Sequence, residues 1–186
     1  MRIIGGKHKG KKLFLPSDKL TRPLKDMVKE SIFNLLQHSK KINISLEDST
    51  ILDLFSGTGS FGLECASRGA KYVVFFEYYK KALMILKKNI IALKVKDSCK
   101  IYENDCFKYF NSNFDLKKKV DIIFIDPPYK EEKINDIFEI ILKKKILKMN
   151  GILIIHRHKK DTIKISEKLK LLDKRDYGNS RIFFGN

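Results

Sequence analysis

The fold is decided by residues 53–62, DLFSGTGSFG, which join an apolar run to a helical pattern. The run 50–55 predicts a buried strand, and the residues that follow predict a helix near 60–68. Glycines at 57, 59 and 62 let the backbone turn tightly and approach a ligand, and the start of the helix adds N–H donors. Glu77 ends the next predicted strand, where its carboxylate can accept hydrogen bonds from ribose hydroxyls. Together these features predict a site for a nucleoside cofactor.

The same alternation of strand and helix continues along the chain. Further strands are predicted at 72–77, 99–103, 120–125 and 151–156, and further helices near 79–94, 105–110 and 131–148. Gly69 is expected to end the helix 60–68, and Asn150-Gly151 the helix 131–148. Short, continuously apolar strands separated by helices predict an α/β fold with a parallel, doubly wound sheet. The chain is expected to close with a hairpin of residues 169–176 and 181–184.

The N-terminal residues differ from this pattern. Residues 1–15 predict a β-hairpin whose turn contains glycines. Thr21-Arg22-Pro23 is then expected to open a helix, with proline at its first position, that runs to about His38. We therefore expect an N-terminal extension at 1–42 and a main domain at 43–186.

Two acidic positions bear on the identity of the cofactor. Asp53 precedes the first glycine of the loop by four residues, and its carboxylate suits the cationic amino-acid end of S-adenosylmethionine better than a phosphate. The alternative for Asp53 is a cap for the loop or the helix. Asp105 can accept from an adenine amino group or cap the helix behind it, and the sequence leaves both open. The predicted cofactor-binding residues are Asp53, Phe55, Ser56, Gly57, Thr58, Gly59, Glu77, Asp105, Cys106 and Asp126.

A second motif, DPPY at 126–129, directly follows the apolar run 120–125. Proline has no N–H and a fixed φ, so this strand end presents carbonyls on a rigid backbone. A planar amine presented edge-on could donate to the carboxylate and to a proline carbonyl while the aromatic ring covers its base. A strand-ending turn with a surface tyrosine is the alternative. The predicted catalytic residues are Asp126, Pro127, Pro128 and Tyr129.

The chain is strongly basic, with a formal net charge of +17. Of its 39 basic residues 33 are lysines, which a lysine-rich composition could place on any surface, so clustering matters more than the total. The first 30 residues hold nine bases against three acids, and residues 143–175 hold twelve against three. Such clusters favour nucleic acid as the partner, through phosphate contacts and counterion release. The candidate RNA-binding residues are Lys7, Lys9, Lys11, Lys12 and Arg22.

Composition also indicates the cellular compartment and the classes of site to expect. Three cysteines without a C-x-x-C motif predict reduced thiols in a cytoplasm. His156 and His158 would share one face of a strand and could pair on a metal, but with no third ligand in view a strand edge with two polar side chains is favoured and no metal site is predicted. No apolar run approaches the roughly 18 residues of a membrane span, and the N-terminus has no signal core. A monomer is expected, because no unpaired apolar stripe is left over.

Three segments carry a family resemblance: DLFSGTG at 53–59, DPPY at 126–129, and the N-terminal run RIIGG…GKKL…TRP…KESIF within 2–33. The whole chain resembles the RsmD family, methyltransferases that modify the exocyclic N2 of a guanine in 16S ribosomal RNA. The resemblance implies a class I methyltransferase sheet with its seventh strand inserted antiparallel. It also implies S-adenosylmethionine as cofactor and the small ribosomal subunit, or an assembly intermediate of it, as partner. One departure is His156-Arg157-His158, where the family usually has an acidic residue.

Three alternatives compete with this interpretation. An adenine-N6 or cytosine-N4 DNA methyltransferase uses the same DPPY corner, but 186 residues leave little room for a target-recognition domain. A nicotinamide-dependent oxidoreductase would use the glycine loop and Glu77, but it leaves 126–129 unexplained. A non-catalytic RNA-binding module needs neither Asp53 nor Asp126.

Overall fold

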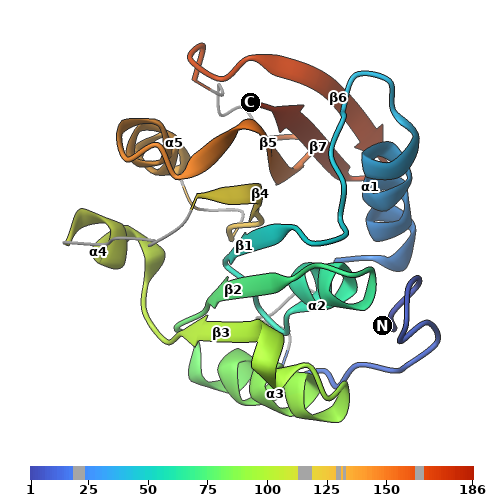
Figure 1. The fold of residues 1–186 in the computed structure, drawn as a ribbon. Helices are drawn as coiled ribbons and strands as arrows, with labels where there is room; N and C mark the ends of the chain where they lie inside the picture. The colour runs from blue at the N-terminus through green and yellow to red at the C-terminus, as the bar shows by residue number, and fades with distance from the viewer. Residues whose placement is uncertain (19–23, 113–118, 129–130, 132, 162–165) are drawn as a thin grey trace.

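The computed structural model describes residues 1–18, 24–112, 119–128, 131, 133–161 and 166–186. A seven-stranded sheet runs through it in the order β3-β2-β1-β4-β5-β7-β6 (Figure 1). β7 is antiparallel to both of its neighbours, and the other adjacent strands are parallel. The predicted α/β fold and the antiparallel seventh strand are thereby confirmed. The elements are α1 (Asp26–His38), β1 (Thr50–Leu54), α2 (Ser60–Ser67), β2 (Tyr72–Phe76), α3 (Lys80–Ala92), a 3₁₀ turn (Lys96–Ser98), β3 (Cys99–Tyr102), α4 (Cys106–Asn111), β4 (Val120–Ile125), α5 (Ile134–Lys143), β5 (Leu147–His158), β6 (Leu171–Tyr177) and β7 (Ser180–Gly185).

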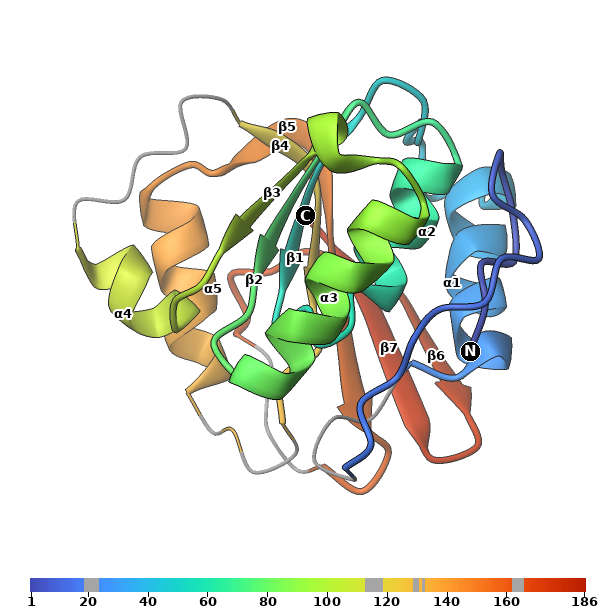
Figure 2. The same cartoon turned by 90° about the horizontal axis from the view of Figure 1, so that it is seen from below.

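The sheet separates two hydrophobic layers because successive side chains of a strand point to opposite faces. In β2, Val73 and Phe75 pack in the layer under α1, α2 and α3, whereas Val74 and Phe76 pack in the layer under α4 and α5. Figure 2 shows the two groups of helices on opposite sides of the sheet. Burial on both faces explains why the strands are continuously apolar. No helix in the described part of the chain has the length and apolar character to cross a membrane.

The N-terminal residues form the predicted hairpin, although its two arms are paired only briefly. A single antiparallel bridge joins Arg2 to Lys12, and the Ile3 amide donates to the Lys11 carbonyl at 2.9 Å. The turn docks on the last residue of α2, where the Lys7 amide donates to the Ser67 carbonyl at 2.7 Å. The hairpin and α1 share the core layer of α2 and α3, since Ile3, Leu13 and residues of α1 belong to it.

Two predicted helix boundaries are wrong. α1 begins at Asp26 rather than at Thr21-Arg22-Pro23, which lie outside the described residues; Lys25 is extended, with ψ 140°, so the helix cannot reach back past it. It ends at His38, as predicted. α5 ends at Lys143 rather than at Asn150-Gly151, because Lys145 takes a positive φ of 49° and the Ile146 amide closes back onto the last turn.

Gly151 is instead a strand residue that permits close packing. A Cβ added at Gly151 would lie 2.9 Å from the Asp121 carbonyl oxygen and 2.7 Å from Leu147 Cδ1. The register of β4 against β5 shifts between Val120 and Ile122, beside this glycine. Asn150-Gly151, which the sequence pattern predicted as a helix stop, therefore lies at an irregularity of β5. The predicted ends of the helix 60–68 and of the closing hairpin are confirmed.

A buried ionic cluster fixes α1 and the hairpin to α2. Lys29 and Glu64 are both fully buried, with Lys29 Nζ 3.5 Å from Glu64 Oε2. The Lys29 ammonium donates to the Arg2 carbonyl at 2.6 Å, and the Glu64 carboxylate accepts from the Ile4 amide and from Arg68 Nε, both at 2.8 Å. Burial lowers the pKa of Lys29, and the carboxylates of Glu64 and Asp26 offset part of that effect.

Removing the acid from this cluster should destabilise the fold. Glu64→Ala removes the only buried carboxylate that the structure describes beside the Lys29 ammonium and leaves it Asp26 at 3.9 Å, so we expect the free energy of unfolding to fall by about 3–5 kcal/mol. The exposed Glu30 on α1 provides the matched control, since Glu30→Ala should change it by no more than about 0.5 kcal/mol. Denaturant unfolding followed by circular dichroism measures both, and equal effects of the two variants would contradict this account.

Candidate active site

The carboxyl ends of β1, β2 and β4 lie side by side because the strands pair in register. Leu54, the last residue of β1, is opposite Phe76 of β2 and Ile125 of β4. The segments that follow these strands are the glycine-rich loop, Glu77 and Asp126. In a parallel sheet they meet at one edge, where ligands of open α/β folds bind.

The glycine loop, residues 55–59, is held in a conformation that needs left-handed backbone. Gly57 and Gly59 have φ values of 55° and 82°, and Phe55 also has a positive φ, 59°, which is costly for a bulky residue. The Ser56 amide donates to the Phe76 carbonyl at 3.0 Å, so the loop is tied to the end of β2. Strained backbone that the surroundings fix in this way is typical of ligand sites.

A buried amide braces the loop from α3. Asn89 is fully buried; its Nδ2 donates to the Thr58 carbonyl at 3.0 Å, and its Oδ1 accepts from the Phe14 amide at 2.8 Å. The segment that follows the hairpin bridge is thereby linked to the loop through one side chain. The sequence analysis missed Asn89, whose signal was a polar residue on the buried face of an apolar helix.

Two of the predicted carboxylates bond to the backbone around the loop. Asp53 is 1% exposed, and its Oδ2 accepts from the Gly62 amide at 3.0 Å in the first turn of α2. Glu77 accepts from the Gly57 and Tyr79 amides, both at 2.7 Å. Burial raises the pKa of Asp53 well above its usual value, and the charges of Asp126 and Glu77 raise it further. Burial likewise raises the pKa of Glu77. The edge thus brings together carboxyl groups whose mutual repulsion a cationic ligand would relieve.

Asp105 and Cys106 follow β3 at the same edge of the sheet. Asp105 is the N-cap of α4, and its Oδ1 accepts from the Phe107 amide at 2.8 Å. Burial raises the pKa of the Cys106 thiol to about 12, so it stays protonated and packs as an apolar side chain. All three cysteines are free.

Asp126 has a side-chain partner that the sequence analysis left without a role. His156, on β5, lies with its Nδ1 2.8 Å from Asp126 Oδ1 and its Nε2 2.9 Å from the Ser180 hydroxyl of β7. The imidazole is 9% exposed and the carboxylate 22%. Burial alone would lower the pKa of His156, but the charge and hydrogen bond of Asp126 outweigh it and raise that pKa above its usual value.

The next residue of β5 holds the segment after Asp126. Arg157 is 3% exposed, pairs with Asp161, and donates to the carbonyls of Pro128 and Glu131 at 3.4 and 3.3 Å. His156 and Arg157 are therefore consecutive residues of β5 that both contact the segment after β4. They brace the corner from the side of β5.

Not every predicted site residue is brought to this edge. Lys7 and Lys9 lie at the turn that docks on the C-terminal end of α2, whereas the glycine loop precedes its N-terminal end, about 12 Å away along the helix. Lys11 and Lys12 are exposed on the returning arm of the hairpin. Tyr129 and Arg22 lie outside the described residues.

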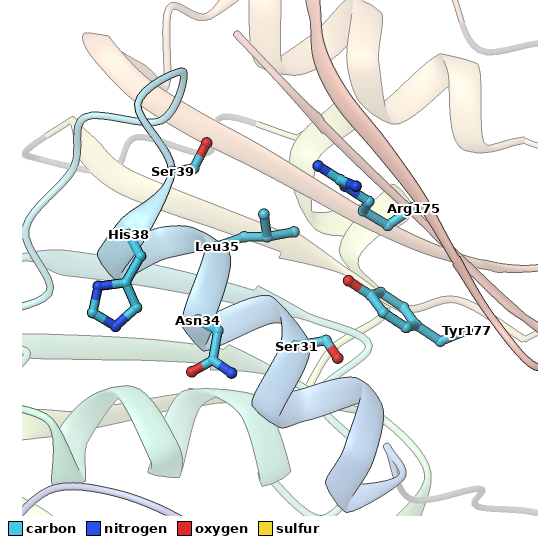
Figure 3. A pocket seen from close by; sticks show the side chains of 7 residues that line it. All are labelled: Ser31, Asn34, Leu35, His38, Ser39, Arg175 and Tyr177. Atoms are coloured by element: carbon cyan, nitrogen blue, oxygen red, sulfur yellow. The ribbon is translucent and has the colours of Figure 1, made fainter.

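A separate hollow of about 660 Å³ lies between α1 and β6 (Figure 3). Arg175 and Tyr177 extend from β6 toward α1, and Leu35 points back toward them. Its other lining residues are Ser31, Asn34, His38 and Ser39. This lining contains none of the carboxylates that meet at the strand ends, so we assign the candidate active site to the strand ends.

Comparison with known proteins identifies the family. The family model described as conserved hypothetical protein 95 matches residues 1–186. The chain belongs to this family. A relative from Haemophilus influenzae, named ribosomal RNA small subunit methyltransferase D, is 30% identical over 178 residues, which are 96% of this chain and 89% of the relative. The resemblance to the RsmD family is therefore confirmed.

Solved structures agree with the fold. The structure of YhhF from Escherichia coli matches 100% of this chain and 96% of its own length with a TM-score of 0.84 and 22% identity. SMU.776, assigned as a methyltransferase and solved with SAH, matches 81% of this chain and 48% of its own length with a TM-score of 0.59 and 22% identity. The fold of this RsmD-family protein is that of class I methyltransferases.

The loop geometry predicts an effect of Gly59→Ala on cofactor binding. Alanine at a φ of 82° costs about 1–2 kcal/mol, and the added Cβ would lie 2.4 Å from Leu86 Cδ1. We expect the affinity for S-adenosylhomocysteine, measured by calorimetry, to fall about tenfold or more.

Gly10 supplies the matched control for this variant. Its φ of 86° imposes the same backbone cost, but nothing lies within 4 Å of an added Cβ. Gly10→Ala should therefore lose stability yet bind S-adenosylhomocysteine as the wild type does. An unchanged affinity of Gly59→Ala would show that the loop does not hold the cofactor.

Proposed function

We propose that this protein transfers a methyl group from S-adenosylmethionine to the exocyclic N2 of a guanine in 16S ribosomal RNA. Membership of the RsmD family supports S-adenosylmethionine-dependent methylation of small-subunit ribosomal RNA. The observation that carries the proposal is the position of Asp126, partly exposed at the end of β4 and directly beside the strand that leads into the glycine loop. Transfer to an amine requires hydrogen-bond acceptors beside the cofactor loop. We call Asp126 and the Pro127 carbonyl, which would accept the N–H bonds of the amine, the acceptor corner.

The cofactor side of the edge fits S-adenosylmethionine, which carries an ammonium and a sulfonium. The carboxylates of Asp53, Glu77 and Asp126 are close enough for the last two to raise the pKa of the first. A cation placed among them relieves this repulsion, whereas a pyrophosphate would add to it. Glu77 at the end of β2 is the proposed acceptor for ribose hydroxyls. This charge pattern disfavours the nicotinamide alternative.

The residues on the acceptor side would help guanine N2, which is a weak nucleophile. When bound, S-adenosylmethionine supplies a methyl carbon already activated for displacement. The lone pair of guanine N2 is delocalised into the ring, so the amine needs help to attack. Asp126 and the Pro127 carbonyl accept its two N–H bonds, concentrate electron density on nitrogen and stabilise the positive charge that develops there. The N–C bond would form as the S–C bond breaks, leaving S-adenosylhomocysteine, and the proton that the nitrogen loses would pass to water.

Tyr129 completes the corner in this proposal. Stacking of its ring on the extruded guanine would contribute roughly 1–3 kcal/mol. The basic hairpin supplies phosphate contacts that position the RNA without reading its sequence. We further propose that the enzyme acts as a monomer on small subunits or their assembly intermediates in the cytoplasm.

Product analysis tests the substrate directly. Labelled S-adenosylmethionine is offered to small subunits from cells lacking the modification, to naked 16S RNA and to duplex DNA, and the labelled nucleoside is identified by mass. We expect N2-methylguanosine from ribosomal RNA. Methyladenine or methylcytosine in DNA would instead support the DNA methyltransferase alternative. No transfer despite cofactor binding would favour the RNA-binding alternative.

Asp126→Ala should separate catalysis from cofactor binding. Because the carboxylate acts on the amine as charge develops, we expect kcat to fall by about 10²-fold or more. Affinity for S-adenosylhomocysteine should stay within about threefold, since the glycine loop is untouched. A kcat within a few-fold of wild type would remove Asp126 from the mechanism.

The hairpin lysines should govern the salt dependence of RNA binding. Replacing Lys9, Lys11 and Lys12 by serine removes up to three phosphate contacts, so the slope of log K against log salt should flatten by up to about two to three. Lys71, Lys94 and Lys96, which are exposed before β2 and β3 and lie outside both basic clusters, give a control of equal charge. Equal slopes for the two triple variants would place the RNA elsewhere.

A further inference from the structure

His156 occupies a position that links the acceptor corner to the antiparallel strand. Its ring is held at both nitrogens, by Asp126 Oδ1 at 2.8 Å and by the Ser180 hydroxyl at 2.9 Å. Register fixes the geometry: Ile155 is paired with Ile125 of β4, and His156 is opposite Ile182 of β7. The imidazole therefore has neighbours on both sides that set its orientation.

This arrangement also sets the orientation of the carboxylate. With Oδ1 bonded to the imidazole and the side chain 22% exposed, the second oxygen is the one available to a ligand. We propose that His156 is a positioning residue for methyl transfer: it holds Oδ1 of Asp126 so that Oδ2 faces the target amine, and its protonation sets the net charge of the acceptor pair. The inference rests on the proposed function, since it assigns Asp126 to the amine.

The charge of the pair determines how well it stabilises the reacting nitrogen. In the described part of the chain, the charged groups that act on His156 are Asp126 at the end of β4 and Arg157, its neighbour on β5. When His156 is protonated, imidazolium and carboxylate cancel, and the pair attracts a developing cation weakly. When His156 is neutral, the full carboxylate charge acts on the nitrogen. Methyl transfer should therefore be faster with neutral His156.

The direction of the pH dependence follows. The pKa of His156 lies above its usual value of 6.5, because Asp126 outweighs the effect of burial. The imidazolium predominates below this pKa and the neutral ring above it. We expect kcat to rise as the pH passes upward through the pKa of His156, with the midpoint above that of an ordinary histidine.

Two variants of His156 separate positioning from structure. Asparagine can place a donor near the position of Nδ1, so His156→Asn should retain kcat at high pH within about tenfold and lose the pH step. His156→Ala removes the contact, and we expect kcat to fall about ten- to a hundredfold with KM for S-adenosylmethionine unchanged. His158→Asn, two residues along the same strand, is the control and should keep the step. A flat wild-type profile, or a step that persists in His156→Asn, would overturn the proposal.

A titration without substrate makes this test independent of the proposed function. The ring resonances of His156, followed by nuclear magnetic resonance, should titrate above pH 6.5 in the wild type and at lower pH in Asp126→Asn, which lacks the carboxylate charge. Identical midpoints in the wild type and Asp126→Asn would overturn the pairing. Normal titrations in a protein without methyl transfer would instead refute the proposed function.

Discussion

The parallel pairing of β1 with β2 and β4 is the constraint on which the site depends. Leu54 is opposite both Phe76 and Ile125, so the glycine loop, Glu77 and Asp126 follow three strand ends at one level. A shift of one residue in either pairing would turn alternate side chains to the other face. The two hydrophobic layers pack against the strands from both sides, so they hold the strand ends from which the polar groups extend.

The three carboxyl groups at this edge, Asp53, Glu77 and Asp126, have different hydrogen-bond partners. Asp53 and Glu77 accept hydrogen bonds from backbone amides, which offsets part of the energetic cost of burying them. A cationic ligand would still be favoured beside these carboxyl groups. Asp126 is handled differently, because a histidine from a neighbouring strand contacts it. The corner at Asp126 therefore contains an imidazole–carboxylate pair, whereas the two carboxylates beside the loop are tied to backbone amides.

Much of the fold and part of the site follow from sequence patterns with local causes. The strand and helix alternation, the glycine loop and the positions of Glu77 and Asp126 depend on periodicity and short spacings, and most boundaries were predicted within two residues. α5 was predicted too long because Gly151 looks like a helix stop, while the positive φ of Lys145 ends the helix. The contacts of His156 and Asn89 link segments 24 to 75 residues apart, and no local pattern carries such pairings.

A crystal structure with S-adenosylhomocysteine bound would test the central claim most directly. The account predicts the ligand at the carboxyl ends of β1 and β2, with its ribose within hydrogen-bonding distance of Glu77 and its sulfur facing the corner formed by Asp126 and Pro127. In that structure Asp126 should keep its contact with His156. A ligand bound elsewhere, such as the hollow between α1 and β6, or a sulfur turned away from Asp126, would contradict it.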